Sequence, residues 1–118
     1  MNEGAGRIVN ISSIMASTGY AGLSVYGATK ASMIGFANSL AREVGRLGIT
    51  VNAVAPGFLE TELTASMDER QRQQIARRSA LQRLATVNDV AEAVAFLLSE
   101  KAGNITGTVL TIGAGSTA

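Results

Sequence analysis

Three side chains near the start of the chain could together transfer a proton to or from a carbonyl group. Ser13 is followed by Tyr26, and Lys30 comes four residues after the tyrosine. Residues four apart on a helix share one face, so the ammonium of Lys30 would lie beside the phenol of Tyr26 and favour its phenolate. Ser13 follows a β-branched segment and would lie at the carboxyl edge of a sheet, where it could hold the carbonyl oxygen. The pattern predicts acid–base chemistry on a carbonyl.

Each of these signals also has an ordinary structural explanation. Most Tyr-x-x-x-Lys pairs are solvated helix contacts worth about 0.2–0.5 kcal/mol. Serines after a strand commonly serve as turn or cap residues. Pro56 and Gly57 could simply end a strand, and the charged stretch 68–78 could be a solvated helix face. Only the combination favours a catalytic interpretation.

The composition restricts the chemistry that is available. The chain has no Cys and no His, which excludes disulfides, cysteine nucleophiles, Ser-His-Asp triads and histidine-based zinc sites, so we expect no metal. The net charge is +1 and most charges are interspersed, so we expect no nucleic-acid partner. The sequence has no apolar run long enough for a bilayer and no start typical of a signal peptide, which predicts a cytoplasmic protein without membrane contact.

The elements that must position these side chains alternate along the sequence. The hydrophobic patterns predict three strands and two main helices, at about 7–12, 49–55 and 108–112 for the strands and about 26–46 and 88–99 for the helices. Thr86 and Asp89 have the spacing of a capping box at the start of the second helix. Right-handed crossovers would make the strands parallel, which predicts an α/β fold in one domain.

Two segments are expected to make further contacts. The helix at 26–46 has one apolar face for the sheet and a second apolar set, with Phe36 at its centre, that predicts contact with a partner helix. The less hydrophobic segment 58–84 has a polar core that predicts a short helix, which could act as a lid over a site.

Four motifs, in this order, resemble those of the short-chain dehydrogenase/reductase family, with the 3-oxoacyl-[acyl-carrier-protein] reductase-like members most similar. They are GRIVNISS at 6–13, YGATK at 26–30, ITVNAVAPG at 49–57 and ITG at 105–107. The resemblance implies a partial Rossmann fold, a doubly wound α/β sheet, and NADP or NAD as the cofactor. It also implies that the segment 58–84 is the variable loop that selects the substrate.

The same resemblance implies roles for individual residues. Ser13 would orient the substrate carbonyl, and Tyr26 would be the general acid in reduction or the general base in oxidation. Lys30 would bind the nicotinamide ribose while tuning Tyr26. Pro56, Gly57 and Thr61 would line the nicotinamide pocket.

The resemblance covers only the C-terminal half of the family's fold. The sequence lacks the strand, glycine-rich turn and helix that hold the cofactor pyrophosphate in this family. We therefore expect an unpaired edge at the strand 7–12, which invites a homo-oligomer or a complementing N-terminal half as a partner. Two hypotheses stay open: an oxidoreductase that is inactive as this chain alone, and a truncated, non-catalytic protein that self-associates in a structural or interaction role.

Overall fold

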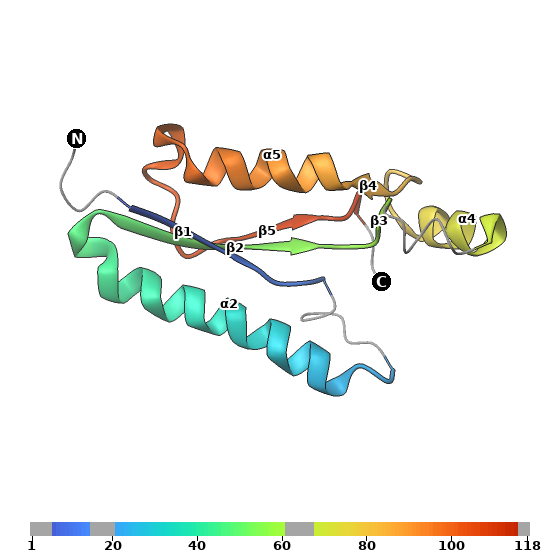
Figure 1. The fold of residues 1–118 in the computed structure, drawn as a ribbon, viewed down its shortest axis with the longest axis horizontal. Coiled ribbons are helices and arrows are strands. Elements are labelled where there is room, and N and C mark those ends of the chain that lie inside the picture. The colour runs from blue at the N-terminus through green and yellow to red at the C-terminus, as the bar shows by residue number, and fades with distance from the viewer. Residues whose placement is uncertain (1–5, 15–20, 61–67, 116–118) are drawn as a thin grey trace.

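The computed structural model describes residues 6–14, 21–60 and 68–115. A parallel three-stranded sheet has helix α2 on one face and helix α5 on the other (Figure 1). The strands are β1 (Gly6–Ile11), β2 (Ile49–Pro56) and β5 (Val109–Ile112), in the order β1-β2-β5. This arrangement confirms the predicted α/β fold class of a partial Rossmann sheet.

Strand β2 is the centre of the structure because it pairs with both other strands. Gly6 of β1 pairs with Ile49, and Ala53 pairs with Val109 of β5. Every residue of β2 from Thr50 to Ala55 is buried. The strand reads as a nearly continuous apolar run, which is typical of a strand covered on both faces.

Helix α2 (Ser24–Val44) packs on the sheet through small side chains. Ala37 and Ala41 are buried against Val51 and Ala53, and larger partly buried residues surround this contact, namely Ile34, Leu40, Val44, Ile49 and Val109. The two alanines let the helix axis approach the sheet closely. A 3₁₀ turn, η1 (Gly45–Leu47), follows the helix, and Gly48 closes it in the left-handed region at φ 76°.

Helix α5 (Val87–Leu98) covers the opposite face and begins with the capping box that the sequence pattern predicts. The side chain of Thr86 accepts from the backbone N–H of Asp89, and the Asp89 carboxylate accepts from the backbone N–H of Thr86. Leu97, in the last turn of this helix, is fully buried. A 3₁₀ turn, η2 (Glu100–Ala102), then leads toward β5.

The segment between β2 and α5 contains a helix and two short strands. Helix α4 (Glu69–Arg78) starts at a capping box formed by Asp68 and Gln71, and it extends beyond the end of the sheet (Figure 1). Strands β3 (Leu59–Glu60) and β4 (Ala85–Thr86) pair in parallel. Because β3 follows β2 and β4 precedes α5, this pair brings the start and the end of the segment together. The sequence pattern did not predict this pair because two-residue strands carry no periodicity.

The molecule exposes more surface than a compact monomer of its mass. Its accessible area is 7555 Å², whereas about 6000 Å² is expected for a protein of this mass. Its radius of gyration is 15.7 Å, against about 13.5 Å expected for this length. Among the described residues β1 has a neighbouring strand on one side only, and its Ile8 and Ile11 are 38% and 43% exposed. Phe36, on the second apolar face of α2, is 58% exposed.

Candidate active site

The carboxyl ends of the three parallel strands meet at one edge of the sheet, and backbone hydrogen bonds hold them together. Ser13 follows the end of β1, and the next residue, Ile14, donates its N–H to the carbonyl oxygen of Pro56 at 3.0 Å. Gly57 in turn donates its N–H to the carbonyl oxygen of Ile112 at 2.9 Å. The predicted site residues Ser13, Pro56 and Gly57 therefore lie at the edge where open α/β sheets bind ligands.

Gly57 is needed for the close approach of two strand ends. A Cβ atom at this position would lie 3.0 Å from the Cα atom of Gly113. That separation is tighter than nine in ten real Cβ contacts, and the obstructing atom belongs to the backbone, which cannot turn aside as a side chain can. Thr61, the remaining residue predicted to line a cofactor pocket, lies outside the described residues.

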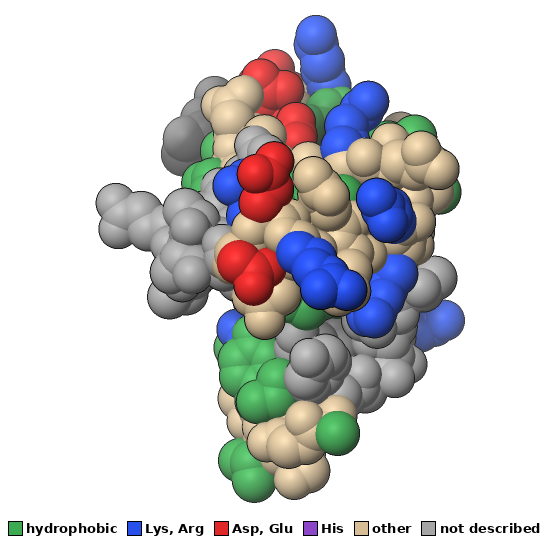
Figure 2. Space-filling view, turned by 90° about the vertical axis from the view of Figure 1, so that its right-hand side faces the viewer, with side chains coloured by type: hydrophobic (Ala, Val, Ile, Leu, Met, Phe, Trp, Pro, Cys, Tyr) green, Lys and Arg blue, Asp and Glu red, His purple; other side chains and the backbone are tan. Residues whose placement is uncertain are grey.

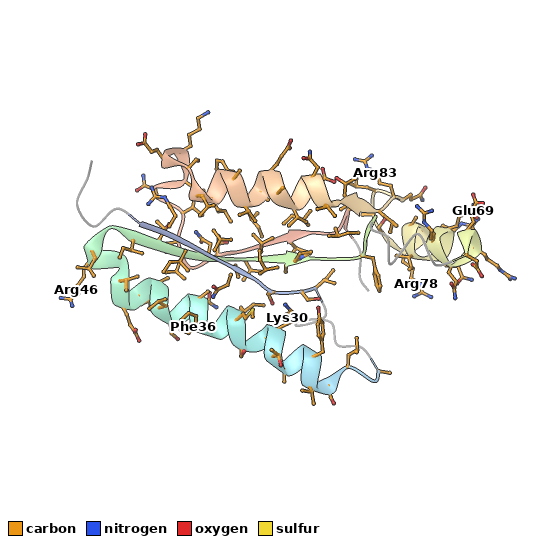
Figure 3. The ribbon with its side chains drawn as sticks, viewed as in Figure 1. Lys30, Phe36, Arg46, Glu69, Arg78 and Arg83 are labelled. Carbon is orange, nitrogen blue, oxygen red and sulfur yellow. The ribbon has the colours of Figure 1, made fainter. Side chains whose placement is uncertain are left out.

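Tyr26 and Lys30 lie on the first turns of α2, beside the same edge. The Nζ atom of Lys30 is 5.7 Å from the centroid of the Tyr26 ring, within cation–π range. Lys30 extends from α2 toward β1 (Figure 3), and its Nζ donates to the carbonyl oxygen of Ile11 at 3.5 Å. Tyr26 is 44% exposed, so a large part of the residue is open to solvent.

The positive charge of Lys30 acts mainly on these two neighbours. Among the described residues its ammonium forms no ion pair, and it is placed between the Tyr26 ring and the Ile11 carbonyl. The two side chains therefore meet at this edge of the sheet through a cation–π contact.

Ser12 is a positioning residue that the sequence reasoning assigned only to a turn or cap. Its hydroxyl donates to the backbone carbonyl oxygen of Lys30 at 2.7 Å, and its N–H donates to the carbonyl oxygen of Val54 at 2.7 Å. Ser12 thereby ties the end of β1 both to β2 and to the turn of α2 that carries Lys30. The pair of serines directly after a strand is the signal that could have indicated this role.

Asn52 of β2 fixes the position of the segment that leads into β5, and so holds β5 in register with β2. Its side chain is fully buried, donates to the carbonyl oxygen of Ile105 at 3.0 Å and accepts from the N–H of Thr108 at 3.1 Å. Thr106 adds a further bond by accepting from the N–H of Val51 at 3.0 Å. The ITG motif at 105–107 lies in the connection before β5, and these hydrogen bonds hold that connection against β2.

The described residues contain no metal-binding cluster and no membrane-spanning helix. The residues that the structure describes include no cluster of three acidic side chains placed to bind a metal ion. Each helix in these described ranges is too short or too polar to cross a bilayer.

Comparisons with known proteins agree with this geometry. The family model described as enoyl-(acyl carrier protein) reductase matches residues 1–117. The 3-oxoacyl-[acyl-carrier-protein] reductase FabG of Haemophilus influenzae is 47% identical over 115 residues, which are 98% of this chain and 48% of that protein. The FabG protein of Escherichia coli is 45% identical over 115 residues, covering 98% of this chain and 47% of its own length. The chain thus spans about half the length of the curated relatives it matches.

A solved structure shows the same arrangement of elements. The crystal structure of the 3-oxoacyl-[acyl-carrier protein] reductase from Brucella melitensis superposes with a TM-score of 0.88 at 32% identity. The match covers 95% of this chain and 42% of that one.

Proposed function

Because this chain belongs to the short-chain dehydrogenase/reductase family, we propose that it provides the catalytic half of a nicotinamide-dependent carbonyl reductase. The observation that carries the proposal is the Tyr26–Lys30 pair, with Nζ 5.7 Å from the ring centroid, at the carboxyl edge of the sheet. The relatives at 45–47% identity are named 3-oxoacyl-[acyl-carrier-protein] reductases. A 3-oxoacyl thioester is therefore the proposed substrate and a 3-hydroxyacyl thioester the proposed product.

The residues at this edge fit the nicotinamide end of NADP or NAD. The Lys30 ammonium is a donor of the kind that ribose hydroxyls accept from, and Pro56 and Gly57 would line the nicotinamide pocket together with Thr61. A bound reduced nicotinamide supplies the hydride for the carbonyl carbon.

The chain's own side chains handle the proton. We propose that the Ser13 hydroxyl holds the substrate carbonyl oxygen by a hydrogen bond and that the Tyr26 hydroxyl gives this oxygen its proton. Tyr26 becomes a phenolate in that step, and the Lys30 ammonium stabilises the new negative charge. The reverse reaction, oxidation of the alcohol, would use the same phenolate as the base.

We further propose that the 118 residues need a second polypeptide segment for turnover. No strand, glycine-rich turn and helix that could bind the cofactor pyrophosphate occurs in the sequence. The outer edge of β1 and the exposed Ile8 and Phe36 offer surfaces for a complementing N-terminal half or for a second copy. We propose a cytoplasmic location for this assembly, as predicted from the sequence.

The large exposed area also supports the second candidate function, a non-catalytic protein that self-associates. Multi-angle light scattering tests association directly, and a dimer or larger oligomer is the expected result. Ile8→Lys places a charge at the β1 edge and should shift the distribution toward smaller species. A folded monomer of the unmodified chain at every concentration would contradict association.

The decisive test of the reductase proposal combines cofactor binding with turnover. The chain alone should show no saturable fluorescence change with NADPH or NADH. Mixed with the N-terminal half of the Haemophilus influenzae relative, it should bind the cofactor and reduce acetoacetyl thioester. Tyr26→Phe should lower that turnover by about 100-fold or more.

Tyr20→Phe, at the chain's other tyrosine, is the matched control and should retain most of the turnover. Turnover of a crotonyl thioester, which has a carbon–carbon double bond but no ketone, is measured alongside. Turnover of the acetoacetyl thioester alone would indicate reduction of the carbonyl. Equal turnover by the Tyr26→Phe variant and the parent mixture would show that the assigned mechanism is wrong. Binding without turnover of either thioester would favour the non-catalytic function.

A further inference from the structure

A recess of about 510 Å³ lies between the C-terminal half of helix α2 and the connection that leads into β5. We call it the Arg42 recess, and its described lining residues are Asn38, Ala41, Arg42, Thr106 and Gly107. Small-molecule sites commonly have volumes of about 300–1,000 Å³. Arg42 follows Lys30 by more than three helical turns, about 18 Å along the axis, and the Arg46 end of α2 lies away from α4 (Figure 3). The recess is therefore separate from the candidate active site.

Three polar side chains of the recess have hydrogen-bond donors to offer. Asn38 and Arg42 are four residues apart on α2, so they share one face of the helix. In the part of the chain that the structure describes, neither the Asn38 amide nor the Arg42 guanidinium takes part in a hydrogen bond or an ion pair. The Thr106 hydroxyl accepts from the N–H of Val51 at 3.0 Å, which leaves its own hydrogen to donate. The recess thus combines one positive charge with several unused donors.

The floor of the recess consists of small residues that pack on the sheet. Ala41 is 5% exposed, and a Cβ atom added to Gly107 would lie 3.7 Å from the Cβ of Ala41. Gly107 has φ +70°, in the left-handed region that favours glycine. Its N–H donates to the carbonyl oxygen of Val51 at 2.8 Å, which fixes this part of the floor to β2. The donors therefore surround a space that no large side chain of the floor fills.

The charge of the Arg42 recess is unopposed among its described lining residues, which include no Asp and no Glu. Two other recesses differ in this respect. One of about 390 Å³ contains Arg83 and Asp89, and another of about 240 Å³ contains Arg72 and Glu69. Figure 2 views the α4 end of the molecule, where Asp and Glu side chains lie beside Lys and Arg side chains. A carboxylate in the lining repels an anionic ligand, so the Arg42 recess suits an anion better than the other two.

We propose that the Arg42 recess binds a small organic carboxylate. The planar guanidinium of Arg42 matches the two oxygens of a carboxylate, and the Asn38 amide and the Thr106 hydroxyl would donate to the same group. The helix dipole accounts for a basic residue in the last turn of α2, but it does not account for the uncharged donors beside it. A bound carboxylate would connect α2 to the segment before β5 and stabilise the folded chain.

The recess stays accessible in the assembly that the reductase proposal requires. The sheet order is β1-β2-β5, so an N-terminal half that pairs with β1 would lie at the opposite edge of the sheet from β5. The binding test can therefore use the 118-residue chain alone or mixed with that half, and it does not depend on turnover.

The probe is butyrate, and binding is followed by nuclear magnetic resonance of the isotope-labelled chain at constant pH and ionic strength. The backbone amide signals of Thr106 and Gly107 should shift and saturate at butyrate concentrations on the order of 1–10 mM. Arg42→Gln removes the charge but keeps a good helix former, and it should weaken binding by about tenfold or more. Arg46→Gln, at an exposed position on η1, is the matched control and should bind within about twofold of the parent.

Asn38→Ala provides a second variant at an exposed helix position and should weaken binding by about threefold or more. Circular dichroism checks that each variant keeps the fold. Butylammonium, which has the same chain length and the opposite charge, should cause no saturable shift. No saturable shift with butyrate would overturn the proposal, including the case in which a second copy closes the recess. Unchanged binding by both Arg42→Gln and Asn38→Ala, or an equal loss in Arg46→Gln, would also overturn it. Tighter binding of inorganic phosphate than of butyrate would indicate a phosphate site and overturn the carboxylate assignment.

Discussion

The hydroxyl of Ser12 donates a 2.7 Å hydrogen bond to the backbone carbonyl oxygen of Lys30, and so links the end of β1 to the helix turn that carries the candidate catalytic lysine. Ser12 is 3% exposed. A buried bond of this kind fixes the distance between two elements, because the residues that it joins are 18 positions apart in the sequence. It therefore contributes both to stability and to the placement of Lys30.

We expect Ser12→Ala to lower the free energy of unfolding by about 1 kcal/mol. Urea denaturation followed by circular dichroism measures the change. Ser32→Ala is the matched control, because the Ser32 hydroxyl bonds only to Thr29 within the same exposed helix surface, and it should change stability by less than about 0.5 kcal/mol. Equal losses in the two variants would show that Ser12 does not link the elements.

Asn52→Ala should destabilise the protein by about 2 kcal/mol, because it leaves a partly buried carbonyl and a partly buried N–H without their partner. These groups are the Ile105 carbonyl and the Thr108 N–H. Chemical denaturation again provides the measurement. Asn104→Ala, at an exposed position of the same connection, should be nearly neutral. A neutral Asn52→Ala would contradict the proposed register role.

Gly115→Ala should destabilise the contact between the end of β5 and the turn after α4. Gly115 has φ +79°, and an added Cβ would lie 2.5 Å from the Cβ of Ala80. The left-handed conformation alone costs alanine about 1–2 kcal/mol, and the clash adds to it. Gly45→Ala is the control with the opposite expectation, since its φ is −57° and open space surrounds it. Thermal unfolding should show a lower midpoint for the first variant and an unchanged or slightly higher one for the second.

The capping box of α5 predicts a specific loss of stability in acid. Hydrogen bonds from Thr86, first from its backbone N–H and then from its side chain, lower the pKa of Asp89 below its ordinary value of 3.8, and the charge of Arg83 adds to this. A depressed pKa in the folded state means that the carboxylate stabilises the fold above pH 3.8 and that this contribution disappears as the pH falls through the folded-state pKa.

Urea midpoints measured from about pH 6 to about pH 2 should therefore fall less steeply for Asp89→Asn than for the parent chain. Glu100→Gln, at an exposed position on η2, serves as the control and should follow the parent. If Asp89→Asn kept the full acid dependence of the parent, the capping carboxylate would not be its source.

Much of this fold follows from hydrophobic patterning. The observed strands and main helices lie within two residues of their expected bounds, because β2 is a buried apolar run and α2 carries an apolar stripe of period 3.6. Both ends of α2 differ by two residues from the expected ones, since the helix begins at Ser24 with no side-chain cap and gives way to the 3₁₀ turn η1 after Val44. The pair β3 and β4 could not be predicted, because tertiary contact alone creates strands of two residues.

The candidate site was partly predictable for a related reason. Tyr26 and Lys30 are four apart on one helix, so local geometry brings them together. The bond from Ser12 to Lys30 joins residues far apart in sequence, and only the packing of α2 against β1 creates it. Likewise the charged stretch 68–78 is visible in the sequence, but its position beyond the end of the sheet depends on how α4 is placed by the fold (Figure 1).

The strand register also determines the order in which the chain can fold. Gly6 pairs with Ile49, and Ala53 pairs with Val109, so no contact in the central sheet is local in sequence. Helix formation in α2 takes on the order of a microsecond or less, whereas parallel pairing must first close loops that contain whole helices. On the ribosome β1 would emerge well before β2 is available to pair with it. Strand β1 therefore lacks its β2 partner until α2 has been synthesised, and during that interval its open edge can bind a chaperone or aggregate.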